Sequence, residues 1–229
     1  MKYQKCFFFF LIFSSLILAQ STKLKMEKQY SFSKAFVHFE QNATDGDVEA
    51  VFEIQGDDDG LDKLTVISPN GNKIIDFNAP LKSTMGIRQF RFESPEPSNI
   101  KSLKAAYPEG EYTFEGRTSK GRLLAGKYRL SHKLPKGTSF IFPKPGSKNV
   151  DPKKLKIEWT GVKNIDSYIV YIEEGDFNFT ITLPGSKNEL SIPPEILKSS
   201  TKYTLGIGTV SKEGNSTFVE TSFTTGSGK

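Results

Sequence analysis

Leu155-Lys156-Ile157-Glu158-Trp159 alternates apolar and charged residues with a period of two. Successive side chains of a β-strand point to opposite faces, so this alternation predicts a strand with Trp159 on its buried face. The same period recurs at Tyr168, Val170 and Ile172. Short strands at intervals of roughly ten residues are typical of a β-sandwich. Further alternating runs in this half lie at 179–183, 190–192, 203–207 and 218–223.

Around this strand, other features follow one another in a recognisable order. They are prolines at 143 and 145, the pair Tyr168 and Val170, the run 190–193, Leu197 with the run 201–203, and the turn 212–216. On these features, residues 140–226 resemble a fibronectin type III domain. The resemblance implies that Trp159 is the core tryptophan and that Tyr203 ties a loop to the sixth strand. No Arg-Gly-Asp tripeptide is present, so integrin-type adhesion is not supported.

The first half follows the same β pattern. Val48, Ala50, Phe52 and Ile54 alternate with polar residues, with Val51 as the exception, and predict another half-buried strand. Residues 31–135 resemble a domain of unknown function found beside such modules in exported bacterial proteins. That resemblance implies a fold and a compartment but no reaction. It rests on the stretches 39–47, 68–71, 92–97, 107–118 and 130–135.

One segment of the first half departs from the β pattern. Ile100, Leu103 and Tyr107 lie at helical spacing, with Ser98 or Asn99 available as the N-terminal cap. Pro108 and Gly110 follow and stop the helix. We therefore expect one short helix between two strands.

The stretches 134–137 and 143–146 are dense in proline and glycine, which suit a linker and the start of an edge strand. They predict a domain break near residue 138. The expected fold is all-β, with two β-sandwich-like domains in tandem at 31–138 and 139–229. The first domain contains the short helix, and the second is fibronectin type III-like.

The N-terminus has the layout of a secretory signal peptide. Lys2 and Lys5 precede an apolar run from residue 7 to 18, and Ala19 offers a small-residue cleavage site. Residues 1–19 are thus predicted to be a signal peptide and 20–30 a polar leader; an uncleaved signal anchor is the alternative. The one cysteine, Cys6, lies in the signal segment, so the mature chain would contain no disulfide and no thiolate site. We expect an exported protein, periplasmic, on the cell surface or secreted, without a membrane span after cleavage.

The charge of the chain is weakly positive and mixed. Its 31 basic and 26 acidic residues leave a net charge of +5, and the basic residues do not cluster. A nucleic-acid-binding surface needs a concentrated basic face, so nucleic acid is not an expected partner.

Two acidic loops are the candidate metal sites. Asp45 and Asp47 form one, and Asp57, Asp58 and Asp59 form the other. Loops rich in Asp and Gly can supply the six to eight oxygens that Ca²⁺ prefers. The alternative is that these side chains only make turn hydrogen bonds. The loops bracket one strand and so lie roughly 20 Å apart, too far to share an ion. No other cofactor is expected.

No catalytic constellation stands out. His38 and His132 are expected to be structural, and no nucleophile turn of the Gly-x-Ser-x-Gly type is present. Glu109 and Glu111 are a pair of carboxylates, but they are predicted to belong to a turn. The protein is therefore not expected to be an enzyme.

The leading hypothesis is a non-catalytic binding or scaffolding protein of the cell envelope that acts through protein–protein interaction. A carbohydrate-binding or accessory module of an exported hydrolase system is the alternative, and it would need exposed aromatic platforms. The stretch 140–142, Phe-Ile-Phe, is predicted to pack between the domains or to present a partner surface. Asn42, Asn178 and Asn215 match the glycosylation pattern, which matters only in a cell that glycosylates exported chains.

Overall fold

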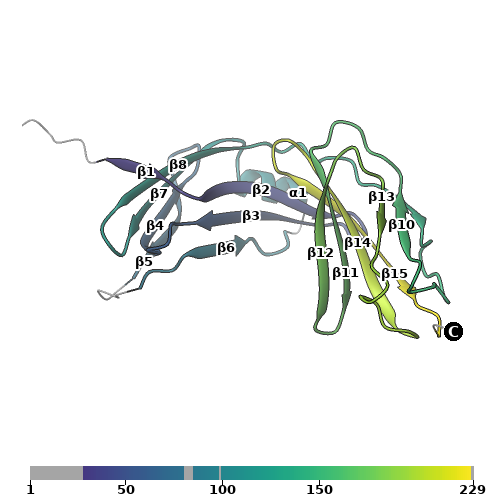
Figure 1. Cartoon of the computed structure of the whole chain (residues 1–229). Coiled ribbons are helices and arrows are strands. Elements are labelled where there is room, and N and C mark those ends of the chain that lie inside the picture. Colours follow the sequence, from purple (N-terminus) through teal and green to yellow (C-terminus); the bar gives the residue numbers. More distant parts are fainter. Residues whose placement is uncertain (1–27, 80–84, 98, 228–229) are drawn as a thin grey trace, which may run out of the picture.

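The computed structural model describes residues 28–79, 85–97 and 99–227 (Figure 1). Within these ranges the chain forms strands β1 to β15 and one helix, α1, so the all-β prediction is confirmed. The predicted signal peptide and most of the predicted leader lie outside the described residues. The end of the leader forms β1 (Gln29–Ser31), which pairs in parallel with β8 (Leu123–Leu130). No helix in the described ranges is long and apolar enough to cross a membrane.

The first half is a sandwich of two sheets. One layer has the order β1, β8, β7 (Gly110–Thr118), β4 (Leu61–Ile67) and β5 (Lys73–Asn78). The facing layer has the order β2 (Lys34–Asn42), β3 (Asp47–Gln55) and β6 (Gln89–Glu93). Val48, Ala50, Phe52 and Ile54 are all buried in the core between the layers, as their alternation predicted.

The predicted helix is α1 (Ile100–Ala106), between β6 and β7. Its cap is Asn99, whose side chain accepts a hydrogen bond from the backbone N–H of Ser102 at 2.9 Å. Leu103 is buried in the core of the first sandwich, and the Tyr107 N–H donates to its carbonyl where the helix ends.

The second half is a sandwich of three strands against four. The smaller sheet has the order β13 (Glu189–Ser191), β10 (Lys156–Trp159) and β9 (Phe140–Phe142). The larger has the order β12 (Phe177–Pro184), β11 (Ser167–Glu174), β14 (Lys202–Val210) and β15 (Ser216–Thr224). This is the strand order of a fibronectin type III domain.

Two residues inferred from that resemblance lie where expected. Trp159 is fully buried and meets the ring of Tyr168 edge to face at 5.2 Å. The hydroxyl of Tyr203 accepts a hydrogen bond from the backbone N–H of Lys198 at 2.8 Å, which ties the preceding loop to β14. Both predictions are confirmed.

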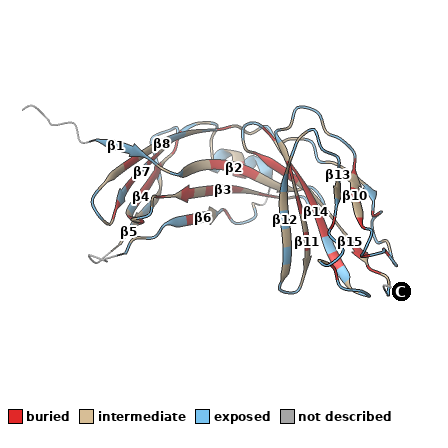
Figure 2. Ribbon diagram, viewed as in Figure 1, coloured by how far each residue is buried: buried red, intermediate tan, exposed pale blue. Residues whose placement is uncertain are grey.

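The two sandwiches share a sheet, which the sequence did not predict. Residues 216–218 of β15 pair in parallel with residues 40–42 of β2. The four strands of the second half thereby continue into β2, β3 and β6 as one seven-stranded sheet. Each half keeps its own apolar core, and Figure 2 shows buried residues along the strands of both halves.

The stretch Phe140–Phe142 does not pack between the halves, so the first of its two predicted roles is wrong, whereas the second role, a partner surface, stays a prediction. As β9 it pairs with β10, and Phe140 packs against the core of the second sandwich. Ile141 and Phe142 remain 49% and 42% exposed. The pairing shifts register between Glu158 and Trp159, so Phe140 lies opposite the buried Trp159 and Phe142 lies opposite Glu158. This bulge turns Phe142 away from the core that Phe140 enters.

Candidate functional site

The junction between the halves is held by a buried amide. Asn215 is fully buried, and its Oδ1 accepts a hydrogen bond from the backbone N–H of Phe39 at 2.8 Å. Its Nδ2 donates to the carbonyls of Ser131 at 2.7 Å and Lys133 at 3.0 Å. One side chain from the β14–β15 turn therefore bonds to β2 and to the segment that follows β8.

Other polar contacts reinforce this junction. The hydroxyls of Thr217 and Thr209 donate to the carbonyls of Pro135 at 2.8 Å and Lys136 at 2.9 Å. Tyr128 on β8 donates through its hydroxyl to the carbonyl of Glu213 at 3.2 Å. Hydrogen bonds spread over the linker, β2 and β8 hold the two halves in one orientation, because rotating either half would break several of them together.

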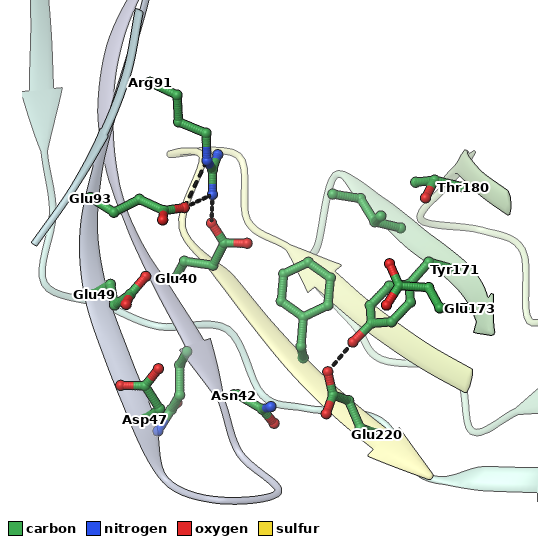
Figure 3. Close-up of a pocket in the computed structure, with 13 residues that line it drawn as sticks. Glu40, Asn42, Asp47, Glu49, Arg91, Glu93, Tyr171, Glu173, Thr180 and Glu220 are labelled. Carbon is green, nitrogen blue, oxygen red and sulfur yellow. Dashed lines mark hydrogen bonds and ion pairs between the residues drawn. The ribbon is translucent and has the colours of Figure 1, made fainter. Parts of the chain in front are cut away.

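A groove lies where the outer face of the shared sheet crosses the junction (Figure 3). We call it the junction groove; its volume is about 390 Å³. Residues of β2, β3 and β6 line one side, and residues of β11, β12 and β15 line the other. The lining residues are Glu40, Gln41, Asn42, Asp47, Glu49, Arg91, Glu93, Ile169, Tyr171, Glu173, Thr180, Phe218 and Glu220.

Two aromatic rings lie flat on the sheet in this groove, over glycines of β14. A Cβ atom at Gly206 would lie 2.1 Å from Cζ of Tyr171, and one at Gly208 would lie 2.4 Å from Cε1 of Phe218. Any larger residue at either position would displace a ring. The two rings lie 6.0 Å apart between their centres. The glycines thus allow the aromatic side chains to lie against the backbone of the sheet.

The phenol of Tyr171 stays protonated and donates a hydrogen bond to the carboxylate of Glu220 (Figure 3). Burial raises the pKa of Tyr171, and the nearby Glu220 carboxylate raises it further. This bond orients the ring in the groove and leaves the second oxygen of Glu220 available.

Carboxylates outnumber cations along the groove. Arg91 forms ion pairs with Glu40 at 2.9 Å, Glu93 at 2.6 Å and, beside the groove, Glu53 at 2.8 Å. Asp47, Glu49, Glu173 and Glu220 form no ion pair with any Lys, Arg or His among the described residues. Arg91 is the one basic residue among the groove's lining residues, and its ion pairs are with other glutamates.

The charges around the groove shift the pKa values of two glutamates in opposite directions. Burial raises the pKa of Glu40, but His38 and Arg91 outweigh it, so the pKa falls below its ordinary value. Burial also raises the pKa of Glu49, and there the neighbouring carboxylates Glu93 and Asp47 add to the effect. The side of the groove away from Arg91 therefore carries uncompensated negative charge.

A second hollow of about 340 Å³ continues the groove along β2, and both are lined by Glu40, Arg91 and Ile169. It is lined also by His38 and Ser216, which are both buried. His38 Nδ1 and the hydroxyl of Ser216 have no hydrogen-bond partner within the described part of the chain.

The acidic loops predicted as metal sites lie at opposite ends of β3. In the first, the Asp47 N–H donates to Oδ1 of Asp45 at 3.0 Å. In the second, the Asp59 N–H donates to Oδ1 of Asp57 at 3.0 Å. These are the turn hydrogen bonds expected of such loops. Asp47 alone among the five aspartates also lines the junction groove.

Basic side chains surround the second acidic loop. Arg122 lies 2.6 Å from both Asp57 and Asp59, Lys120 lies 2.7 Å from Asp59, and Arg88 lies 2.9 Å from Asp58. The hydrogen bonds from Lys120 and Arg122 lower the pKa of Asp59. In the described ranges no three His, Cys, Asp or Glu side chains are grouped to hold a metal ion. Calcium binding stays a prediction, whereas the turn bonds and ion pairs are present.

The other candidate site residues, two histidines and two glutamates, lie against neighbouring groups of the fold. His38 Nε2 lies 3.6 Å from Glu40, and His132 Nε2 lies 2.7 Å from the carbonyl of Tyr107. The two histidines thus bond to different neighbours on different segments. Glu109 accepts a hydrogen bond from the backbone N–H of His132, and Glu111 pairs with Lys127 at 2.6 Å.

Sequence reasoning missed most of the groove. In the sequence Arg91 is one charged residue of an alternating run, and Asn215 matches only the glycosylation pattern. The burial of Asn215 shows instead a structural role. One signal was available: Gly206 and Gly208 interrupt an apolar strand, and glycine inside a strand often marks a close approach of another group.

The known proteins that match this chain match it in structure rather than in sequence. No protein-family model matches the chain, and no curated protein matches it in sequence. Solved structures similar to it include a two-domain fibronectin type III segment of chicken tenascin (18% identity, 86% of this chain and 100% of that one, TM-score 0.33). Fibronectin(III)-like modules of Clostridium thermocellum CbhA match at 9% identity over 85% of this chain and 95% of that one, with a TM-score of 0.34. Domains FN1–FN3 of chicken CNTN1 match at 10% identity over 86% of this chain and 65% of that one, with a TM-score of 0.33. At these TM-scores the fold assignment rests on the strand order, Trp159 and Tyr203.

Proposed function

We propose that this protein is an exported, non-catalytic binding or scaffolding protein of the cell envelope, and that its junction groove receives a basic segment of a partner protein. The proposal of export rests on the apolar N-terminal run and its small-residue end at Ala19. The proposal of binding rests on the groove.

One observation carries the proposed function: four carboxylates with no cationic partner in the described ranges line a groove together with two half-buried aromatic rings. A lysine or arginine entering the groove would neutralise Glu49 and its neighbours, which repel one another in the free protein. The faces of Tyr171 and Phe218 would contact the aliphatic part of the side chain, or an arginine guanidinium by a cation–π interaction.

The groove is also preformed. Strands of both sandwiches line it, and the hydrogen bonds of Asn215, Thr217 and Thr209 hold those sandwiches together. A partner therefore binds without first ordering a loop, which lowers the entropic cost of association.

The carbohydrate-binding alternative has less support. Its best platform would have been the single tryptophan, and Trp159 is fully buried in the core. Tyr171 and Phe218 are the aromatic side chains that remain in the groove, so both partner classes can be tested at one place.

The test is calorimetric titration of the purified protein with a short peptide of alternating lysine and threonine, and separately with soluble oligosaccharides of cell-wall type. We expect peptide binding that weakens as salt is added. We expect Glu49→Lys to weaken it at least tenfold, whereas Glu195→Lys, the same charge change at an exposed loop residue outside the groove, should leave it unchanged.

Equal peptide affinity in wild type and Glu49→Lys would show that the groove is not the binding site. Saccharide binding that is lost on changing Tyr171→Ala would favour the carbohydrate alternative instead.

A further inference from the structure

β12 is an open edge of the seven-stranded sheet. It pairs with β11 in a regular antiparallel register over all eight of its residues, and no other described strand pairs with it. Its sequence Phe-Asn-Phe-Thr-Ile-Thr-Leu-Pro contains no charged residue. Natural proteins usually protect such an edge with charges, bulges or early prolines, and β12 has only Pro184 at its end.

The phase of the β11–β12 ladder identifies the backbone groups that face outward. The Gly185 N–H donates to the carbonyl of Asp166 at 2.8 Å, so this pair is hydrogen-bonded. Hydrogen-bonded and non-hydrogen-bonded pairs alternate along an antiparallel ladder. Asn178, Thr180 and Thr182 therefore direct both their N–H and C=O groups to the open side.

We propose that β12 pairs antiparallel with β12 of a second copy of this chain, about a two-fold axis at Thr180. In this register Thr180 lies opposite Thr180 of the other copy, and Asn178 lies opposite Thr182. All three outward pairs are then hydrogen-bonded pairs, each exchanging both backbone bonds. The two seven-stranded sheets become one continuous sheet.

The side chains of β12 suit a second copy. On the inner face, Phe179 lies opposite Ile181 of the other copy and Phe177 opposite Leu183, which are favourable aromatic–aliphatic cross-strand pairs. Glu174 and Asp176 lie at one end of the strand and Lys187 lies just beyond the other. Antiparallel pairing brings the acidic end of one copy beside the basic end of the other, so the charges are complementary.

Sedimentation equilibrium of the purified protein over a concentration series tests the association. Wild type is expected to be a dimer that dissociates on dilution. Thr180→Pro should weaken the dimer at least tenfold, because it removes the central outward N–H. The monomer should keep its fold, since proline is tolerated at an edge position whose N–H faces solvent. Ser191→Pro, on β13 of the other sheet, is the control and should dimerise normally.

Cysteine cross-linking tests the register in chains in which Cys6, the one native cysteine, is replaced by serine. Thr180→Cys places the two thiols on the axis, where opposed Cα atoms lie about 5.5 Å apart and a disulfide can form. With Asn178→Cys the two cysteines are offset by four residues along the paired strands, because Asn178 lies opposite Thr182 of the other copy. Their Cα atoms are then about 13 Å apart at 3.3 Å per residue. We expect a covalent dimer only with Thr180→Cys.

A monomer at all concentrations would overturn the proposal. So would a dimer unaffected by Thr180→Pro, or cross-linking that is as fast at Asn178 as at Thr180. Thr180 also lines the junction groove, but these outcomes are distinguishable from those of the titrations, because sedimentation and cross-linking report the association of two copies and use no peptide or saccharide.

Discussion

Replacing Asn215 by alanine should uncouple the two sandwiches. The substitution removes the acceptor of the Phe39 N–H and the donors to the carbonyls of Ser131 and Lys133. Phe39 is fully buried, so its N–H would have neither a protein acceptor nor water as a hydrogen-bond partner, at a cost of about 1–3 kcal/mol. Each lost bond to a carbonyl adds about 0.5–1.5 kcal/mol. We expect the free energy of unfolding to fall by about 3 kcal/mol.

Urea unfolding followed by fluorescence and by far-UV circular dichroism measures this loss. Trp159, the only tryptophan, reports on the second sandwich, while circular dichroism reports on the whole chain. In wild type the two curves should coincide, and in Asn215→Ala they should separate as the halves unfold independently.

The matched control is Asn188→Ala, at an exposed residue between β12 and β13. It should change the free energy of unfolding by less than about 0.5 kcal/mol. If Asn215→Ala also lowered the free energy of unfolding by less than about 0.5 kcal/mol, and its fluorescence and circular dichroism curves coincided, the coupling role of the amide would be refuted.

Four further predictions concern the separate parts of the chain. Trp159→Ala should cost the second sandwich about 3–5 kcal/mol in urea unfolding; a change under about 0.5 kcal/mol would mean that the indole is exposed. The fragment 139–229 has its own core and should give a dispersed amide NMR spectrum, whereas collapsed peaks would contradict a separate domain. Glu49→Gln should be more stable than wild type at pH 7 but not at pH 4. The raised pKa of Glu49 means that the folded state loses stability as pH rises above the ordinary value of 4.5; a difference independent of pH would contradict this. Intact mass of protein from the native envelope should show a chain that begins near residue 20, and a mass of all 229 residues would exclude cleavage.

Local patterns were enough for much of the fold. The period of two assigned the buried faces of β3, β10 and β11, because a strand alternates its side chains whatever it pairs with. Helical spacing with a cap and a stop located α1, because these signals also lie within a few residues of one another in the sequence. The order of proline, tryptophan and tyrosine features identified the second sandwich, since Trp159 and Tyr203 serve that core through contacts close in sequence.

Only the tertiary structure decided how the halves join and where the groove lies. The pairing of β15 with β2 connects residues more than 170 positions apart, such as Ser216 and Glu40. Alternation says which face of a strand is buried but not which strand lies beside it. Asn215 and Arg91 look like ordinary polar residues until that pairing buries one and places the other among glutamates of β2, β3 and β6. The sequence therefore determined which side chains fill each core. The groove depends on strands of both halves meeting, and such long-range pairing is set by the packing of the whole chain.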